Sequence, residues 1–180
     1  MALLKTERLA DGRILNFDRD TVELPNGTVA TFDMLRHPGA AAVLPFLDDP
    51  ALPDPRVILI RQFRHAADGW IWEIPAGRRD AGEDPVQTAH RELREETGYT
   101  CTHLEKVTEL LTAPGFTDER IHLYRAWGLT PGAHAREADE FLEVHELPLS
   151  RLMAMALDGT IIDAKTLVTI LAINAGRNLT

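Results

Sequence analysis

The sequence predicts an α/β fold in which strands alternate with helices and a small antiparallel sheet comes first. Three patterns predict it: a charged segment bounded by helix caps at residues 84–98, an apolar strand-like run at 57–63, and two helical patterns that close the chain. The 180 residues correspond to one globular domain, with room for a small appendage. Their 44% apolar content is sufficient for a hydrophobic core.

Residues 4–36 are predicted to form the small antiparallel sheet. Short strand patterns occupy residues 14–17 and 21–24, a hairpin turn lies at 25–27, and the return strand covers 28–35. Three short strands cannot bury a core by themselves. This segment is therefore expected to pack against another surface, either its own main domain or a second chain.

The main domain is predicted from apolar runs and capping residues. Strands are expected at residues 40–47, 57–63, 70–74, 102–111, 121–127 and 141–147. Ser150 is the predicted N-cap of a helix over residues 151–157, and Asp163 that of a helix over residues 164–175.

A third helix is predicted at residues 85–97, between the strands at 70–74 and 102–111. Asp84 suits its N-cap, Gln87 can complete a capping box, and Gly98 can end the helix in the left-handed conformation. Apolar groups at helical spacing form one stripe, made by Val86, Ala89, Leu93 and Thr97.

Two carboxylates on this helix indicate a metal site. Glu92 and Glu96 are one turn apart beside the apolar stripe, so they repel each other and are partly desolvated. Mg²⁺ removes that repulsion, because it is commonly held by one or two carboxylates together with substrate phosphates. Gly77 would permit a tight turn that directs backbone carbonyls at the same cation. The alternative is a solvated helix face, the usual explanation for a run of charges.

The segment from Gly77 to Tyr99 resembles the signature of the Nudix hydrolases. The matching positions are Gly77, Glu83, Arg91, Glu92, Leu93, Glu95, Glu96 and Gly98. Tyr99 departs from the signature, which usually has an aliphatic residue there. The resemblance implies an α/β/α sandwich with a mixed sheet, and a pyrophosphatase that uses Mg²⁺, with Mn²⁺ as a substitute.

The same resemblance assigns roles to the signature residues. Metal ligands would be Glu92, Glu95, Glu96 and the carbonyl of Ala76. Arg91 would orient the glutamates through an ion pair. Gly77, Glu83 and Gly98 would be structural.

Pro114, a short distance beyond the signature, resembles the proline of the ADP-ribose pyrophosphatase branch. In that branch an arginine spaced from the signature glycine as Arg64 is contacts the substrate phosphate. A glutamate on the polar loop at residues 131–139 or just after it is the catalytic base, and Glu137 and Glu140 are both candidates. Arg61, Glu73 and Glu119 are further candidates for substrate binding.

The implied reaction is hydrolysis of ADP-ribose to AMP and ribose 5-phosphate. In this branch the N-terminal sheet is exchanged between two chains, which implies a homodimer. We therefore expect residues 1–38 to be a dimerisation element and residues 39–180 to be the Nudix domain. Alternatives are a pyrophosphatase for GDP-mannose, NADH, a dinucleoside polyphosphate or coenzyme A, a non-catalytic nucleotide-binding sensor, and a purely structural acidic domain.

Composition restricts the partners and the compartment. A formal net charge of −9 argues against a nucleic acid or an anionic membrane as partner. The single Cys101 excludes an internal disulfide and fits a reducing compartment. Since no run approaches the ~20 apolar residues of a membrane span, a soluble cytoplasmic protein is expected.

Overall fold

The computed structural model describes residues 1–133 and 141–177, which form two compact units. The first unit contains residues 1–39 and 111–120, and the second contains residues 40–110 and the described part of 121–177. The chain thus leaves the second unit at Leu111 and re-enters it after Arg120. Residues 111–120 were expected in the main domain, whereas in the structure they belong to the first unit.

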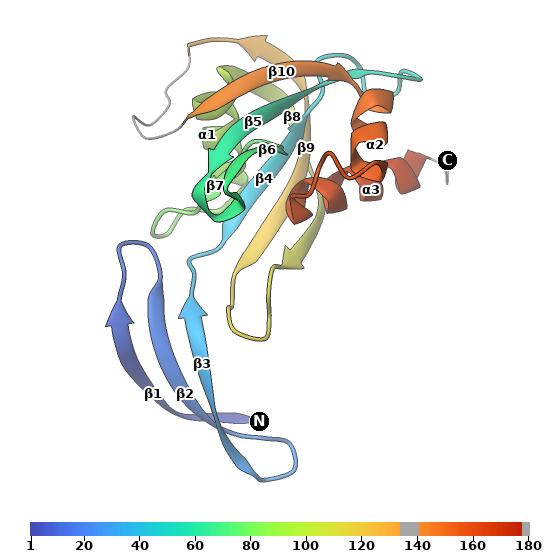
Figure 1. Cartoon of the computed structure of the whole chain (residues 1–180). Coiled ribbons are helices and arrows are strands. Elements are labelled where there is room, and N and C mark those ends of the chain that lie inside the picture. The colour runs from blue at the N-terminus through green and yellow to red at the C-terminus, as the bar shows by residue number, and fades with distance from the viewer. Residues whose placement is uncertain (134–140, 178–180) are drawn as a thin grey trace. The chain divides into compact units, whose positions relative to one another are not determined.

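The first unit is built on an antiparallel meander of β1 (Ala2–Asp11), β2 (Asn16–Glu23) and β3 (Val29–Arg36), drawn in blue in Figure 1. The two predicted strands at 14–17 and 21–24 fall on the single strand β2, and β1 was not predicted. Asp18 and Asp20 resemble turn residues in the sequence. In the structure they are buried and paired with Arg8 and Arg36 on the flanking strands, so β2 continues through them.

Residues 111–120 attach to β3 within the first unit. The Leu35 N–H donates to the Phe116 carbonyl at 2.7 Å, and the Thr117 hydroxyl donates to the Leu35 carbonyl at 3.0 Å. Arg36 also pairs with Asp118 at 3.3 Å. These contacts add the segment to the open edge of the meander.

The second unit contains two sheets. The strands are β4 (Ala40–Pro45), β5 (Arg56–Arg64), β6 (Gly69–Glu73), β7 (Ala76–Arg78), β8 (Tyr99–Leu111), β9 (Arg120–Pro131) and β10 (Leu142–Pro148). One sheet has the order β7-β4-β9-β8 and is mixed, because β4 pairs parallel with β9 and antiparallel with β7. The other has the order β10-β5-β6 and is antiparallel.

Helices cover both sides of this β layer, as Figure 1 shows. They are α1 (Pro85–Thr97), α2 (Leu149–Leu157) and α3 (Ala164–Arg177). Side chains of β4 alternate between two buried clusters: Val43 belongs to a cluster with Leu93 of α1, whereas Leu44 belongs to one with Leu152 of α2 and Ile170 of α3. The predicted α/β/α sandwich with a mixed sheet is confirmed.

The predicted cap of the second helix was wrong. Helix α2 begins at Leu149 with Pro148 as its N-cap. The Ser150 N–H and hydroxyl both donate to Asp54, each at 2.8 Å. Ser150 therefore ties α2 to the loop before β5 instead of capping the helix.

Candidate active site

Helix α1 is fixed at both ends by the predicted residues. Asp84 accepts a hydrogen bond from the Val86 N–H at 2.8 Å, and Gln87 accepts one from the Asp84 N–H at 3.0 Å, which completes the capping box. Gly98 ends the helix with φ 79°. These caps set where α1 begins and ends, and therefore which of its side chains face the sheet.

The glutamates beside the apolar stripe are nearly buried. Glu92 is 6% exposed and Glu96 is 1% exposed. Ala89, Leu93 and Thr97 are buried as predicted, whereas Val86, in the first turn, is 44% exposed. Two carboxylates enclosed to this degree require compensating charge or hydrogen bonds.

Strand β7 brings the backbone up to these carboxylates. The Ala76 N–H donates to Oε2 of Glu96 at 2.9 Å. A Cβ added at Gly77 would overlap the carboxylate of Glu92. Gly77 lies in β7 and is not among the residues with positive φ, so the predicted tight turn at this glycine was wrong. A glycine is required here because Glu92 packs directly against its backbone.

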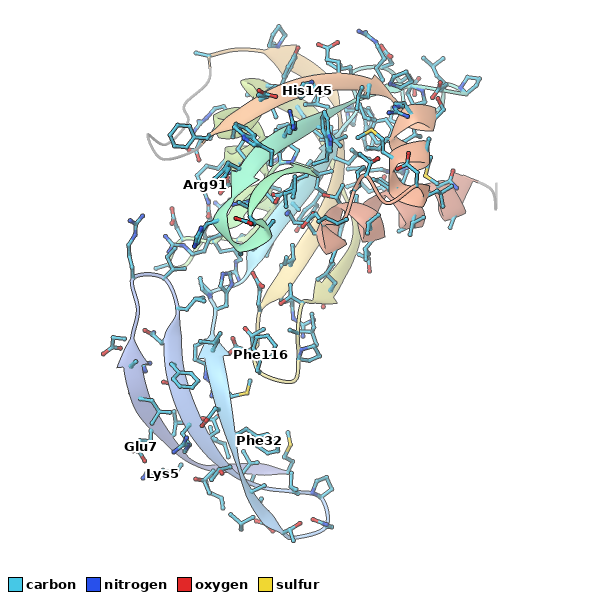
Figure 2. The ribbon with its side chains drawn as sticks, in the orientation of Figure 1. Lys5, Glu7, Phe32, Arg91, Phe116 and His145 are labelled. Atoms are coloured by element: carbon cyan, nitrogen blue, oxygen red, sulfur yellow. The ribbon has the colours of Figure 1, made fainter. Side chains whose placement is uncertain are left out.

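Arg91, labelled in Figure 2, connects the glutamates to the loop before the helix. Its Nε and Nη2 donate to the two carboxylate oxygens of Glu83, both at 3.0 Å. Nη1 donates to Glu92 at 2.5 Å and to Glu95 at 3.0 Å. Nη2 also donates to the Arg78 carbonyl at 2.8 Å. One guanidinium therefore holds the loop, β7 and α1 together.

This ion-pair cluster shifts the pKa of both partners. Hydrogen bonds from Arg91 are the main reason that the pKa of Glu83 is lowered to about 2, with further hydrogen bonds from the Asp80 N–H and the Thr88 hydroxyl. The same Glu83 contact raises the pKa of Arg91 above its usual value. Both groups are charged throughout the neutral range.

The donor set fits a hard divalent cation held partly by other ligands. Glu92 and Glu96 supply carboxylate oxygens beside the backbone of Ala76, and Glu95 is engaged by Arg91 and Arg94. Among the described residues, no group of three or more His, Cys, Asp or Glu side chains is placed to hold a metal ion alone. Mg²⁺ is commonly bound by one or two carboxylates, with water and substrate phosphate completing its shell.

Arg64, at the end of β5, forms a second ion-pair cluster. Its Nε and Nη2 donate to the two oxygens of Glu73 at 2.9 and 2.7 Å. Lys165 of α3 donates to Glu73 at 2.9 Å and to Asp163 at 3.0 Å. Burial would raise the pKa of Glu73, but Arg64 and Lys165 outweigh it and hold that pKa below its usual value. The hydrogen bonds to Glu73 are the main reason that the pKa of Arg64 is raised above its usual value, and the charge of Glu96 adds a smaller contribution.

The remaining predicted residues lie elsewhere. Arg61 is half-exposed on β5 and lies over the ring of Trp70. Pro114 and Glu119 belong to the first unit, where Glu119 accepts a hydrogen bond from Thr112 at 2.8 Å. Glu137 and Glu140, the candidate bases, lie outside the described residues. Roles for all of these in substrate binding or catalysis stay predictions.

Sequence reasoning missed Lys165 and Thr166 at the start of α3. Thr166 is fully buried, donates to Asp163 at 2.5 Å and accepts a hydrogen bond from the Ile74 N–H at 2.9 Å. One signal was available in the sequence. A lysine in the first turn of a helix that is apolar around much of its circumference opposes the helix dipole and, when buried, needs a nearby carboxylate.

A cavity of about 530 Å³ lies apart from these clusters, between β8, β9 and α3. Its lining includes Trp127, Arg125 and Lys106, and none of the signature residues. Arg125 is paired with Glu105, and Lys106 with Glu109. This cavity is therefore not part of the site formed by Glu92 and Glu96.

Residues 36–168 match the NUDIX domain family. This chain belongs to the Nudix family. The prediction made from the signature is confirmed, and the match extends well beyond the signature to include the strands of the second unit and the start of α3.

Three Nudix relatives align over most of their length. A methanol dehydrogenase activator of Bacillus methanolicus is 40% identical, covering 93% of this chain and 89% of the relative. An ADP-ribose pyrophosphatase of Bacillus subtilis is 40% identical, and the match covers 89% of this chain and 85% of the relative. An ADP-ribose pyrophosphatase of Mycobacterium tuberculosis is 36% identical, and the match covers 96% of this chain and 82% of the relative.

Among solved structures, an ADP compounds hydrolase superposes with a TM-score of 0.81. The two chains are 22% identical, and the match covers 98% of this chain and 94% of the other. At this level of identity the likeness shows the fold alone.

Proposed function

We propose that this Nudix protein hydrolyses the pyrophosphate bond of ADP-ribose, or of a closely related nucleoside diphosphate sugar, with Mg²⁺ as its cofactor. The observation that carries the proposal is the pair of nearly buried carboxylates, Glu92 and Glu96, seated against the backbone at Gly77 and Ala76. The relatives named ADP-ribose pyrophosphatase support the choice of substrate. AMP and ribose 5-phosphate would be the products.

The chain's own residues position the charges that phosphoryl transfer needs, since catalysis of this reaction is mostly positioning and electrostatic stabilisation. Arg91 holds Glu92 and Glu95 in place through hydrogen bonds. Arg64 presents a guanidinium, which binds a diphosphate through paired hydrogen bonds.

Two further groups complete the proposed mechanism. Glu92, Glu96 and the Ala76 carbonyl, with Glu95 as a further ligand, would hold a divalent cation, which would polarise phosphate oxygens and lower the pKa of a bound water. Glu137 or Glu140 takes the proton from the attacking water. Arg61, Glu73 and Glu119 remain candidates for substrate contact.

A homodimer formed through the N-terminal sheet is part of the proposal. Phe32 and Phe116, both labelled in Figure 2, are 42% and 53% exposed in the first unit, and Leu3 is 60% exposed. A three-stranded meander has little stability alone, and large apolar side chains left exposed on it are suited to an interaction surface. A second copy of this sheet would cover them.

We also propose that the protein acts in the cytoplasm, on small molecules and not on nucleic acids or membranes. Its net charge of −9 and single cysteine support this. Among helices of the described residues, none has the length and apolar character needed to cross a membrane.

The decisive experiment compares wild type with Glu96→Gln. AMP release from ADP-ribose should require Mg²⁺, stop with a chelator, and fall about 100-fold or more in the variant, because an uncharged amide is a poor ligand for a hard cation. Glu109→Gln, the same change at a β8 residue that pairs with Lys106, is the matched control and should retain full activity.

A substrate panel run alongside separates the alternatives. Faster turnover of GDP-mannose, NADH, a dinucleoside polyphosphate or coenzyme A, still lost in Glu96→Gln, would keep the site and reject ADP-ribose. Binding of ADP-ribose without turnover of any substrate would favour a nucleotide sensor. If the protein neither binds ADP-ribose nor is stabilised by Mg²⁺, a purely structural domain is the remaining alternative.

A further inference from the structure

The cluster around Arg64 is buried at one end and open at the other. Glu73 is 2% exposed and Lys165 is 9% exposed, whereas the Arg64 side chain is 40% exposed. Nε and Nη2 of Arg64 are used on Glu73. Its Nη1 hydrogen bonds to no residue in the described part of the chain. The guanidinium therefore has a fixed edge and an edge available to a ligand.

Lys165 occupies an unfavourable position for a cation. It lies in the first turn of α3, where the helix dipole repels positive charge. It is also buried, and a buried ammonium is costly unless carboxylates compensate it. Asp163 and Glu73 both accept hydrogen bonds from its Nζ, at 3.0 and 2.9 Å.

Stability alone does not account for this arrangement. Buried ion pairs are often matched or exceeded in stability by apolar residues of similar volume. Helix α3 is already attached to the sheet by Ile170, Ile173 and the Thr166 hydrogen bond to Ile74. Lys165 adds a second ion pair to Glu73, beside the one with Arg64, and so fixes the position of the Glu73 carboxylate.

We propose that Lys165 is a positioning residue for substrate binding: it holds the Glu73 carboxylate, which in turn orients Arg64 so that Nη1 faces the diphosphate. The inference rests on the proposed function, because it takes the ligand of Arg64 to be the diphosphate of the substrate. Glu73, given above as a candidate for direct substrate contact, would then act through Arg64 instead, since both of its oxygens already accept hydrogen bonds from Arg64 and Lys165.

The ion-pair geometry shows why Lys165 matters. Oε2 of Glu73 accepts from both Arg64 and Lys165, and Oε1 accepts from Arg64 alone. Without Lys165 the carboxylate would be anchored only by Arg64, so the two side chains could rotate together toward solvent. Binding energy would then be spent on ordering them.

A double-mutant cycle tests the proposal. The proteins are wild type, Arg64→Ala, Lys165→Met and the double variant, and the probe is ADP with Mg²⁺, followed by calorimetry. Arg64→Ala should weaken binding about 10- to 100-fold, the range of a charge-assisted hydrogen bond. Lys165→Met should weaken it about tenfold in the wild type, and by less than about twofold once Arg64 is absent.

Thr169→Val is the matched control. Thr169 is buried one turn further along α3, and its hydroxyl donates to the Lys165 carbonyl at 2.7 Å and not to Glu73. It should lower the melting temperature without changing the affinity for ADP. In steady state, Lys165→Met should raise KM for ADP-ribose while kcat changes by less than about threefold, because only binding is affected.

The proposal is overturned if the effects of Arg64→Ala and Lys165→Met multiply in the double variant, if Lys165→Met binds ADP like wild type, or if Thr169→Val weakens binding equally. Absence of ADP binding by the wild type would also overturn it.

If Lys165→Met does not fold, a second variant replaces it. Lys165→Met combined with Glu73→Gln removes both buried charges and should reproduce the weak binding of Arg64→Ala. Wild-type binding by that variant would be contrary evidence.

The ADP experiment is independent of the sugar. A wild type that binds ADP and shows the coupling, yet does not hydrolyse ADP-ribose, would reject the proposed substrate and retain the role of Lys165. Hydrolysis of ADP-ribose without coupling between Arg64 and Lys165 would retain the proposed substrate and reject the role of Lys165.

Discussion

At the scale of single residues, the position of Glu92 depends on an atom that is absent. Gly77 has no Cβ, and the carboxylate of Glu92 fills the space where one would be. The arrangement places the carboxylate against the main chain of β7, next to Ala76. No side chain larger than hydrogen is compatible with both the strand and this contact.

Gly77→Ala should therefore impair activity more than folding. The added methyl group displaces Glu92, which lowers turnover of ADP-ribose at least about tenfold and costs about 1–3 kcal/mol of unfolding free energy as overpacking. Turnover and urea denaturation measure the two effects. Gly69→Ala is the control, because a Cβ at Gly69 meets no atom within 4 Å. Equal activity of the two variants would contradict this account of Glu92.

At the scale of secondary-structure elements, α1 is joined to the loop before it by one ion pair. Glu83 lies in the loop and Arg91 lies in the helix. The Thr88 hydroxyl adds a hydrogen bond to Glu83 at 2.9 Å, and the Arg79 guanidinium donates to the Glu83 carbonyl at 3.0 Å. The loop is thus anchored at both the side chain and the backbone of one residue.

The Glu83–Arg91 pair should make stability depend on pH. The pKa of Glu83 is about 2 in the folded protein, against 4.5 for an unperturbed glutamate. Because the folded value is lower, the stabilisation is complete above about pH 4.5 and is lost as pH falls from there toward 2. Glu83→Gln should therefore melt below wild type at pH 7, and the difference should shrink at pH 3. Melting temperatures by circular dichroism check this, and a difference that does not depend on pH would contradict it.

Elements with local signals could be predicted from the sequence, and those fixed by distant partners could not. The caps and stripe of α1 lie within one short segment, so Asp84, Gln87 and Gly98 were identified correctly. Ser150 was misread because its partner, Asp54, is 96 residues away. Strand β1 was missed because its pairing depends on contacts across the sheet, such as Arg8 with Asp18.

The candidate site divides in the same way. The spacing of Glu92 and Glu96 on a helix is a local property, so the pair could be identified from the sequence. The packing of Glu92 against Gly77 depends on how β7 and α1 meet, and the contact of Lys165 with Glu73 joins residues that are 92 positions apart in the chain. Only the fold brings those groups together.

At the scale of the whole molecule, the apolar surface of the first unit predicts self-association. Phe32 pairs across the meander with Asp20, and Lys5 pairs with Thr21. Since side chains alternate between the two faces of a strand, Phe32 and Lys5 lie on opposite faces. This provides two exposed positions on one sheet for comparison, and Figure 2 labels both.

Light scattering should give the mass of a dimer for the wild type. Phe32→Glu places a charge in the proposed contact and should shift the protein toward monomer at micromolar concentration, because burying an unpaired carboxylate is costly. Lys5→Glu, an equally drastic change on the other face, should remain dimeric. A wild type that is monomeric at all concentrations would reject the dimer.

The way the chain passes between its two units has a consequence for synthesis. The meander is complete in sequence by Arg36, but the segment Leu111–Arg120 that pairs with the edge of β3 is translated much later. At 5–20 residues per second the ribosome needs roughly 4–16 s to reach it. During that interval the nascent chain exposes the unpaired edge of β3 and the side chain of Phe32, a surface that chaperones or a neighbouring nascent chain could bind. Deleting residues 1–39 would likewise leave Leu111–Arg120 without its strand, so the two units cannot be separated by a single cut.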